Sequence, residues 1–242
     1  MRNFSVIIMT LGMVGVTFAA DNAPHTSLKK WGRFYLGVNS GFTVHDIQLT
    51  SQQLGFTHPS GKCNTRTDFS SFFPGLQLGF MRPLPNQFIL GMEANVTFNT
   101  NQKTNLDCNC PYNPYVSDRF SLRVPMQSSL KGRIGHIIIG HTRTILPYLT
   151  AGASFNQTKL SYSNEGGDYY AQNKTQAGAL IGAGIEWSFQ KNWSFRAEYT
   201  YADYGTAHNL RIPQVYGLMD PNGNARVDLN TNNFAFSVNY WL

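Results

Sequence analysis

Apolar and polar side chains alternate, residue by residue, along much of this chain. The pattern is clearest from Phe88 to Phe98, where every second residue is apolar and Gly91, Glu93 and Asn95 lie between them. A period of two places the apolar set on one face of a β-strand. Each patterned segment is close to the roughly 9–11 residues with which a tilted strand crosses a bilayer. The eight segments are residues 34–44, 72–80, 88–98, 130–138, 147–155, 176–189, 193–201 and 233–242.

The links between these segments alternate in length. Short links follow the second, fourth and sixth segments, near residues 83–86, 140–145 and 190–192. An up-and-down outer-membrane barrel has this layout, with short periplasmic turns at one end and long extracellular loops at the other. We therefore predict an all-β fold, an eight-stranded antiparallel transmembrane barrel with four long extracellular loops. The predicted loops are residues 45–71, 99–127, 157–175 and 203–230.

Alternation alone fits two kinds of barrel. A soluble lipocalin-type barrel has an apolar lumen, whereas an outer-membrane barrel has an apolar exterior. Here the polar face carries mid-strand charges of both signs, which can pair inside a closed lumen. It is also rich in Gly, which suits the narrow interior of eight strands. Both observations favour the membrane barrel. The predicted lumen charge network is Glu93, Lys131, Arg133, Glu186, Arg196 and Glu198.

Aromatic residues of the apolar face gather near the ends of the segments. Membrane barrels place aromatic side chains in two belts, one at each interface between lipid and water. A soluble barrel or sandwich gives no reason for this placement, so it too favours the membrane barrel. The predicted interfacial aromatics are Phe72, Phe80, Phe88, Phe98, Trp187, Phe189, Trp193 and Tyr201.

The first residues form a separate unit. Arg2 precedes an apolar run over residues 4–18, and the small residues Ala19 and Ala20 close it, which is the pattern of a secretory signal. A transmembrane anchor is the alternative, but the run is shorter than the ~20 residues of a spanning helix. We predict a signal peptide over residues 1–19 cleaved after Ala19, a short periplasmic segment over residues 20–33, and the barrel over residues 34–242.

The composition argues against several other classes of protein. Charged residues make up 13% of the chain and aromatic residues 14%, which disfavours a disordered chain. The mean hydropathy is −0.27, so the chain does not read as a helical membrane protein. The net charge is +6, yet no basic cluster exceeds Lys29, Lys30 and Arg33. We therefore expect contacts with anionic lipid head groups and no nucleic-acid partner.

The chain has three cysteines, Cys63, Cys108 and Cys110. Their number and the single residue between the last two do not match the spacing of a zinc site. In an oxidising compartment, one disulfide and one free thiol is the simplest arrangement. Cys63 with Cys108 or Cys110 is the preferred pairing, and a Cys108–Cys110 bridge is the alternative. We expect no metal and no cofactor.

Three stretches resemble the middle strands of small outer-membrane β-barrels of Gram-negative bacteria, the opacity-protein and OmpA-like transmembrane group. They are residues 129–135 (SLKGRIG), 146–153 (LPYLTAGA) and 192–205 (NWSFRAEYTYADYG). The resemblance implies an outer-membrane location, lipopolysaccharide as a neighbour, and assembly by the barrel-assembly machinery. It also implies a C-terminal assembly signal, although the family usually ends in Phe or Trp. The matching positions are Phe234, Phe236, Val238, Tyr240 and Leu242.

Three functions fit such a barrel. The first is a non-enzymatic surface protein with a structural or adhesive role, with residues 108–115 and 162–170 supplying Tyr, Asn and Gly for contact with host or matrix ligands. The second is a narrow porin-like channel, although eight strands leave little lumen. The third is a lipid-modifying enzyme, for which only His58 and Ser60 have a suitable spacing, inside a predicted loop. The oxygen-rich segment 220–231 departs from a calcium loop and reads as an ordinary turn.

Overall fold

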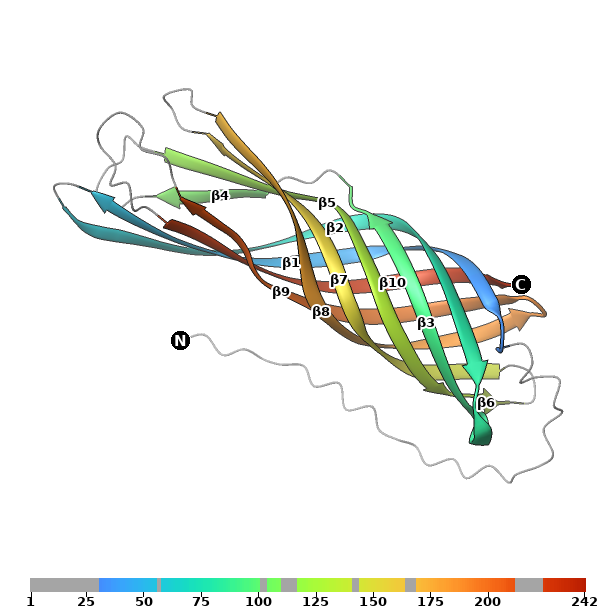
Figure 1. The fold of residues 1–242 in the computed structure, drawn as a ribbon. Coiled ribbons are helices and arrows are strands. Elements are labelled where there is room, and N and C mark those ends of the chain that lie inside the picture. Colours follow the sequence, from blue (N-terminus) through green and yellow to red (C-terminus); the bar gives the residue numbers. More distant parts are fainter. Residues whose placement is uncertain are drawn as a thin grey trace.

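The fold is a barrel of long antiparallel strands (Figure 1). A computed structural model describes residues 31–55, 58–100, 104–109, 117–140, 144–163, 169–211 and 224–242. None of these residues belongs to a helix that is long and apolar enough to span a membrane. The strands are β1 (Phe34–Gly55), β2 (His58–Pro83), β3 (Phe88–Phe98), β4 (Thr104–Asn109), β5 (Ser117–His136), β6 (Ile138–Ile139), β7 (Thr144–Ser163), β8 (Tyr169–Gln190), β9 (Trp193–Arg211) and β10 (Asn224–Trp241).

Eight of the described strands close into a ring. Each pairs with its neighbours in the order β5-β3-β2-β1-β10-β9-β8-β7, and the β5–β7 ladder completes the circle. β4 continues the β3 side of β5, and β6 adds two residues to β7. β2 and β3 are joined by a 3-10 turn, η1 (Pro85–Gln87), in which Asn86 has a φ of 59°. The predicted all-β antiparallel up-and-down barrel is confirmed.

The register of the ladders fixes the tilt of the strands. A row of paired residues that leaves β9 at Trp193 returns to β9 at Asp203, ten residues further along the strand. Eight strands with this stagger tilt by about 40° from the barrel axis, within the usual range for barrels. The row is Trp193, Tyr240, Leu36, Leu78, Ala94, Leu130, Ala153, Ala179 and Asp203.

The outer face carries a continuous apolar band. On β3, the outward residues from Phe88 to Phe98 include Leu90 and Met92, which are half exposed or more. Ten residues of strand cover about 33 Å, or about 25 Å of height at this tilt, which matches the apolar band of an outer-membrane barrel. Aromatic rings mark both limits of the band, as in the tilted contact between Phe34 and Phe80 at one end and the edge-on contact between Phe42 and Phe72 at the other.

Most of the segments predicted as long loops are instead continuations of the strands. β1 and β2 extend through residues 45–71 apart from residues 56 and 57, and β7, β8, β9 and β10 extend in the same way. Asn224 to Asp228, predicted as part of a turn, lie in β10. The prediction of long loops was therefore wrong over these ranges, although short turns do join β2 to β3 and β8 to β9 at the other end.

The error arose because the alternation inverts where the strands leave the apolar band. Within the band on β1, Phe34, Leu36 and Phe42 point outward, and polar residues point inward. Beyond it, Ile47 and Leu49 are buried in the interior while the residues between them point outward. The exterior now faces water rather than lipid, so the apolar residues move to the inner face. If apolar residues are expected only at the positions that face outward in the band, the pattern on β1 ends at Val44. The strand itself continues to Gly55.

The part of the barrel beyond the band, termed the ectodomain, divides into two sheets. The β8–β9 ladder ends at Ala179–Asp203 and the β2–β3 ladder at Gly75–Thr97, whereas the ladders inside each group continue. Figure 1 shows the two groups diverging, with β1, β2, β9 and β10 in one and β4, β5, β7 and β8 in the other. Both groups contribute to one apolar cluster. Its members are Ile47, Leu49, Leu122, Leu160, Leu180, Ala202, Tyr204, Val227 and Leu229.

The position of the band gives a direct test with a charged side chain. Leu149 lies near the middle of the band and is 63% exposed. Replacing Leu149 with Arg is expected to lower the free energy of unfolding by about 2–4 kcal/mol, the cost of a cation at mid-bilayer. Gln48→Arg, on the outer face of the ectodomain, is expected to cost less than about 1 kcal/mol. Urea unfolding of protein folded in lipid vesicles measures both, and equal costs would contradict this placement of the band.

Candidate functional site

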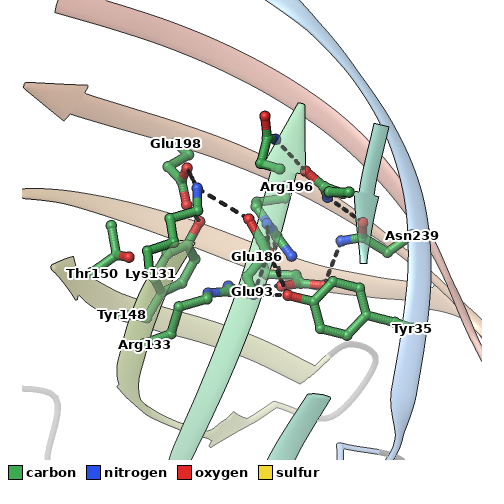
Figure 2. Close-up of polar contacts among 12 residues, drawn as sticks. Tyr35, Glu93, Lys131, Arg133, Tyr148, Thr150, Glu186, Arg196, Glu198 and Asn239 are labelled. Carbon is green, nitrogen blue, oxygen red and sulfur yellow. Dashed lines mark hydrogen bonds and ion pairs between the residues drawn. The ribbon is translucent and has the colours of Figure 1, made fainter. Parts of the chain in front are cut away.

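The six charged residues of the predicted lumen network lie together in the barrel interior (Figure 2). Each is at most 9% exposed, and three acids face three bases, so the layer is neutral. Arg196 binds both Glu93 and Glu186, with its Nε 3.2 Å from Glu186 Oε2. Lys131 Nζ lies 3.0 Å from Glu93 Oε1 and also pairs with Glu198. Arg133 completes the set at 3.0 Å from Glu186 Oε2. The bases thus link all three carboxylates into one connected layer.

Aromatic residues that the sequence did not single out complete this layer. The Tyr35 hydroxyl donates to Glu93, and the Tyr148 hydroxyl donates to Glu198 Oε2 at 2.7 Å. The guanidinium carbon of Arg133 lies 3.8 Å from the centre of the Tyr148 ring. Trp241 Nε1 donates to Ser194 Oγ, which in turn donates to Glu186. These three aromatic residues and Ser194 fall on the inward positions of their strands, so strand parity was a signal that could have identified them.

Neutral polar side chains fill the lumen on the ectodomain side of the charges. Asn39 donates to Gln77 at 3.0 Å, and the Thr43 hydroxyl donates to Asn233 at 2.7 Å. The Gln127 amide donates to the hydroxyl of Tyr204 at 2.7 Å. A cavity of about 30 Å³ remains among these groups and the charged layer, which is room for one or two water molecules. It is far too small for a ligand of substrate size.

Apolar side chains seal both ends of the polar lumen. The ectodomain cluster described above closes one end. At the other end, near the short turns, Trp31 stacks edge-on against Trp241 at 5.0 Å between ring centres. This end cluster comprises Trp31, Tyr35, Met81, Ile89, Ile137, Leu146, Tyr148 and Trp241. Along the barrel axis, the neutral ion-paired layer therefore lies between two apolar clusters.

The other predicted residues lie on the outer face or outside the described residues. Phe80, Phe88, Trp187, Phe189 and Trp193 lie at the short-turn end of the apolar band, and Phe72, Phe98 and Tyr201 lie at the ectodomain end. Phe234, Phe236 and Tyr240 point outward on β10, Val238 lies between them, and Leu242 follows the strand. The signal peptide and any pairing of Cys63, Cys108 and Cys110 lie outside the described residues and side chains.

One Ser–His pair occurs within the described residues. His45 Nε2 lies 3.2 Å from Ser71 Oγ, and both side chains are buried in the lumen. His45 Nδ1 has no hydrogen-bond partner among the described atoms, and the ring stacks on Phe69 at 4.4 Å between ring centres. A nucleophile needs an oriented base and access to substrate. Here the base, His45, has no acidic side chain to orient it among the described atoms, and both side chains are buried away from substrate.

The fold and its filled lumen define the class of protein, a transmembrane barrel of the outer-membrane type. The family model described as outer membrane protein beta-barrel domain matches residues 10–241, and the chain belongs to this family. It is similar to a 31 kDa outer-membrane immunogenic protein of Brucella melitensis, 24% identical over 88% of each chain. It is also similar to a 22 kDa outer membrane protein of Rhizobium leguminosarum, 23% identical over 76% of this chain and 70% of the relative. The protein is located in the outer membrane of a Gram-negative bacterium.

The chain is also similar to solved structures of outer-membrane proteins, at lower sequence identity. The outer membrane protein OprG of Pseudomonas aeruginosa is 12% identical, with 88% of this chain and 99% of that chain covered and a TM-score of 0.48. Neisserial surface protein A is 14% identical, with 86% and 97% covered and a TM-score of 0.39.

Proposed function

We propose that this protein is a non-enzymatic outer-membrane anchor that holds a rigid β-sheet ectodomain at the cell surface, and that its lumen does not conduct. The filled lumen carries this proposal. Eight strands leave an interior that side chains can fill, and here a connected ion-pair layer lies between two apolar clusters. Opening a path would require breaking ion pairs that are buried and hydrogen-bonded, which is costly.

The lack of a conducting path is directly testable. Refolded protein inserted into planar bilayers is expected to show no steady current steps at moderate voltage, while a porin reconstituted in parallel shows them. Insertion is checked independently by the fast migration of the folded form on an unboiled gel. Steady, reproducible steps from the folded protein would favour the channel alternative and contradict the proposal.

Adhesion is the second candidate, and the ectodomain favours it. The described strands continue well past the band and form an extension with its own apolar core. Loops carried on a rigid scaffold are common sites of recognition. The Brucella relative is named an immunogenic protein, which is consistent with a surface that other molecules reach.

Deletion of the strand-connecting segments tests the adhesive role. Cells expressing protein without residues 110–116, or without residues 164–168, are expected to bind host cells or matrix proteins less than cells expressing the full chain. A matched change at the other end, within residues 141–143, controls for expression and folding. Equal binding by all strains would contradict the adhesive role and would remain consistent with the anchor role.

A further inference from the structure

Charges on the outer face of the ectodomain are unevenly distributed. Among the side chains that the structure describes beyond the band, the carboxylates lie in the sector formed by β9, β10, β1 and β2, and the cations there are paired with them. Arg66 donates from Nε to Asp46 at 2.9 Å and from its terminal nitrogen to the same carboxylate. Arg226 Nε lies 3.0 Å from Asp228 Oδ1. The two described cations of this sector, Arg66 and Arg226, are therefore neutralised within the protein.

The opposite sector places two cations against each other. Arg123 of β5 and Lys159 of β7 are direct partners in the antiparallel register. Both point outward, because Leu122 and Leu160 next to them are buried in the interior. Like charges directly opposite each other on a sheet are destabilising. A site for an anion between the two side chains would convert this repulsion into binding.

Neither cation has a carboxylate partner among the side chains that the structure describes, and the Nε of Arg123 is buried without a hydrogen-bond acceptor. Their neighbours on this face are neutral and polar. Gln157 precedes Lys159 by two residues, Asn173 pairs with Lys159 across the β7–β8 ladder, and Ser121 lies beyond Arg123. Among the described side chains, the pair therefore offers several donors and meets no competing negative charge.

The pair lies just beyond the apolar band. Lys159 follows Phe155, a half-exposed residue of the band, by four residues, which is about 13 Å along the strand and about 10 Å in height. Arg123 lies beyond an irregularity in β5 that ends at Met126, whose partner across the ladder is Phe98. Long basic side chains can reach back from this height toward the membrane surface.

We propose that Arg123 and Lys159 bind a phosphate group of a lipopolysaccharide in the outer leaflet. Charge-assisted hydrogen bonds from a guanidinium and an ammonium group suit a phosphate. The height of the pair matches the head-group layer rather than the tip of the ectodomain. This location favours a membrane lipid over a sulfated polysaccharide from outside, which would more readily meet charges further from the membrane.

Native mass spectrometry of the full mature barrel in detergent tests the site. The probes are lipid A with two phosphates, the same lipid A after removal of its phosphates, inorganic phosphate, and a heparin-derived oligosaccharide. Arg123→Gln/Lys159→Gln removes the pair, and Arg66→Gln/Arg226→Gln removes the same charge from the other sector. Lys159→Gln alone serves if the double variant does not fold, as judged by migration on an unboiled gel.

The expected result is at least tenfold tighter binding of phosphorylated over dephosphorylated lipid A, lost in R123Q/K159Q and kept within about twofold in R66Q/R226Q. K159Q alone is expected to lose at least threefold. Unchanged binding in R123Q/K159Q, or an equal loss in both double variants, would overturn the proposal. It would also be overturned if only the heparin oligosaccharide, or only inorganic phosphate, depended on the pair.

Discussion

Replacing Arg196 with Met is expected to lower the free energy of unfolding of the barrel by about 3–5 kcal/mol, the usual cost of removing one partner of a buried ion pair. Arg196 is 1% exposed and binds both Glu93 and Glu186. Its loss leaves the layer with an uncompensated negative charge in the buried interior of the barrel. Urea titration of the folded form in vesicles, followed on unboiled gels and by tryptophan fluorescence, measures the change.

A double variant separates charge balance from packing. Arg196→Met/Glu186→Met restores neutrality, so it is expected to cost clearly less than the sum of the two single variants, as contacting residues usually do. Arg226→Met is the matched control, since Arg226 forms an exposed pair, which contributes little. Additive costs for Arg196 and Glu186 would contradict a connected lumen network.

Truncating Leu229 to Ala is expected to destabilise the ectodomain by about 2–5 kcal/mol, as for other buried Leu side chains. Leu229 is fully buried in the cluster that joins the two ectodomain sheets. Because this cluster lies beyond the band, the loss is expected to be local. Hydrogen exchange should quicken in the outer halves of β1, β9 and β10, while the amides within the band remain protected.

Leu149→Ala is the matched control for Leu229→Ala. Both remove the same atoms, but Leu149 points toward lipid from the middle of the band. Its exchange profile above the membrane is expected to match that of the wild type. If Leu229→Ala also left ectodomain exchange unchanged, the apolar cluster would not be what holds the two sheets together.

The sequence was sufficient to predict the barrel because lipid and lumen impose opposite chemistries on alternate residues. Glu93 on the lumen side and Leu90 and Met92 on the lipid side are separated by parity alone. The same parity was enough to group the six lumen charges on one face. Which base meets which acid was not predictable, since the pairing depends on the ten-residue stagger of the strands around the ring.

The ectodomain was missed for a physical reason. Beyond the band, water replaces lipid outside the barrel, so Ile47 and Leu49 carry the apolar pattern on the opposite parity from Phe34 and Phe42. In β5 the apolar residues keep one parity, and the irregular register between Arg123 and Met126 turns that parity from the lipid face to the interior. A search for one unbroken alternation therefore ends β1 at the membrane surface. The pairing of Arg123 with Lys159 across the β5–β7 ladder was not predictable from the sequence either. It depends on the register of the ladder beyond that irregularity.

A spin-label scan along β10 tests the central claim most directly. Single cysteines from Val227 to Tyr240, in a background with the three native cysteines replaced by Ser, are labelled in vesicles and probed with oxygen and with a water-soluble nickel complex. Odd positions are expected to be inaccessible to both throughout. Even positions are expected to meet oxygen from Phe234 to Tyr240 and nickel at Asp228 and Asn230. Nickel access at Val227 and Leu229 would show loops instead of a closed ectodomain and would contradict the account.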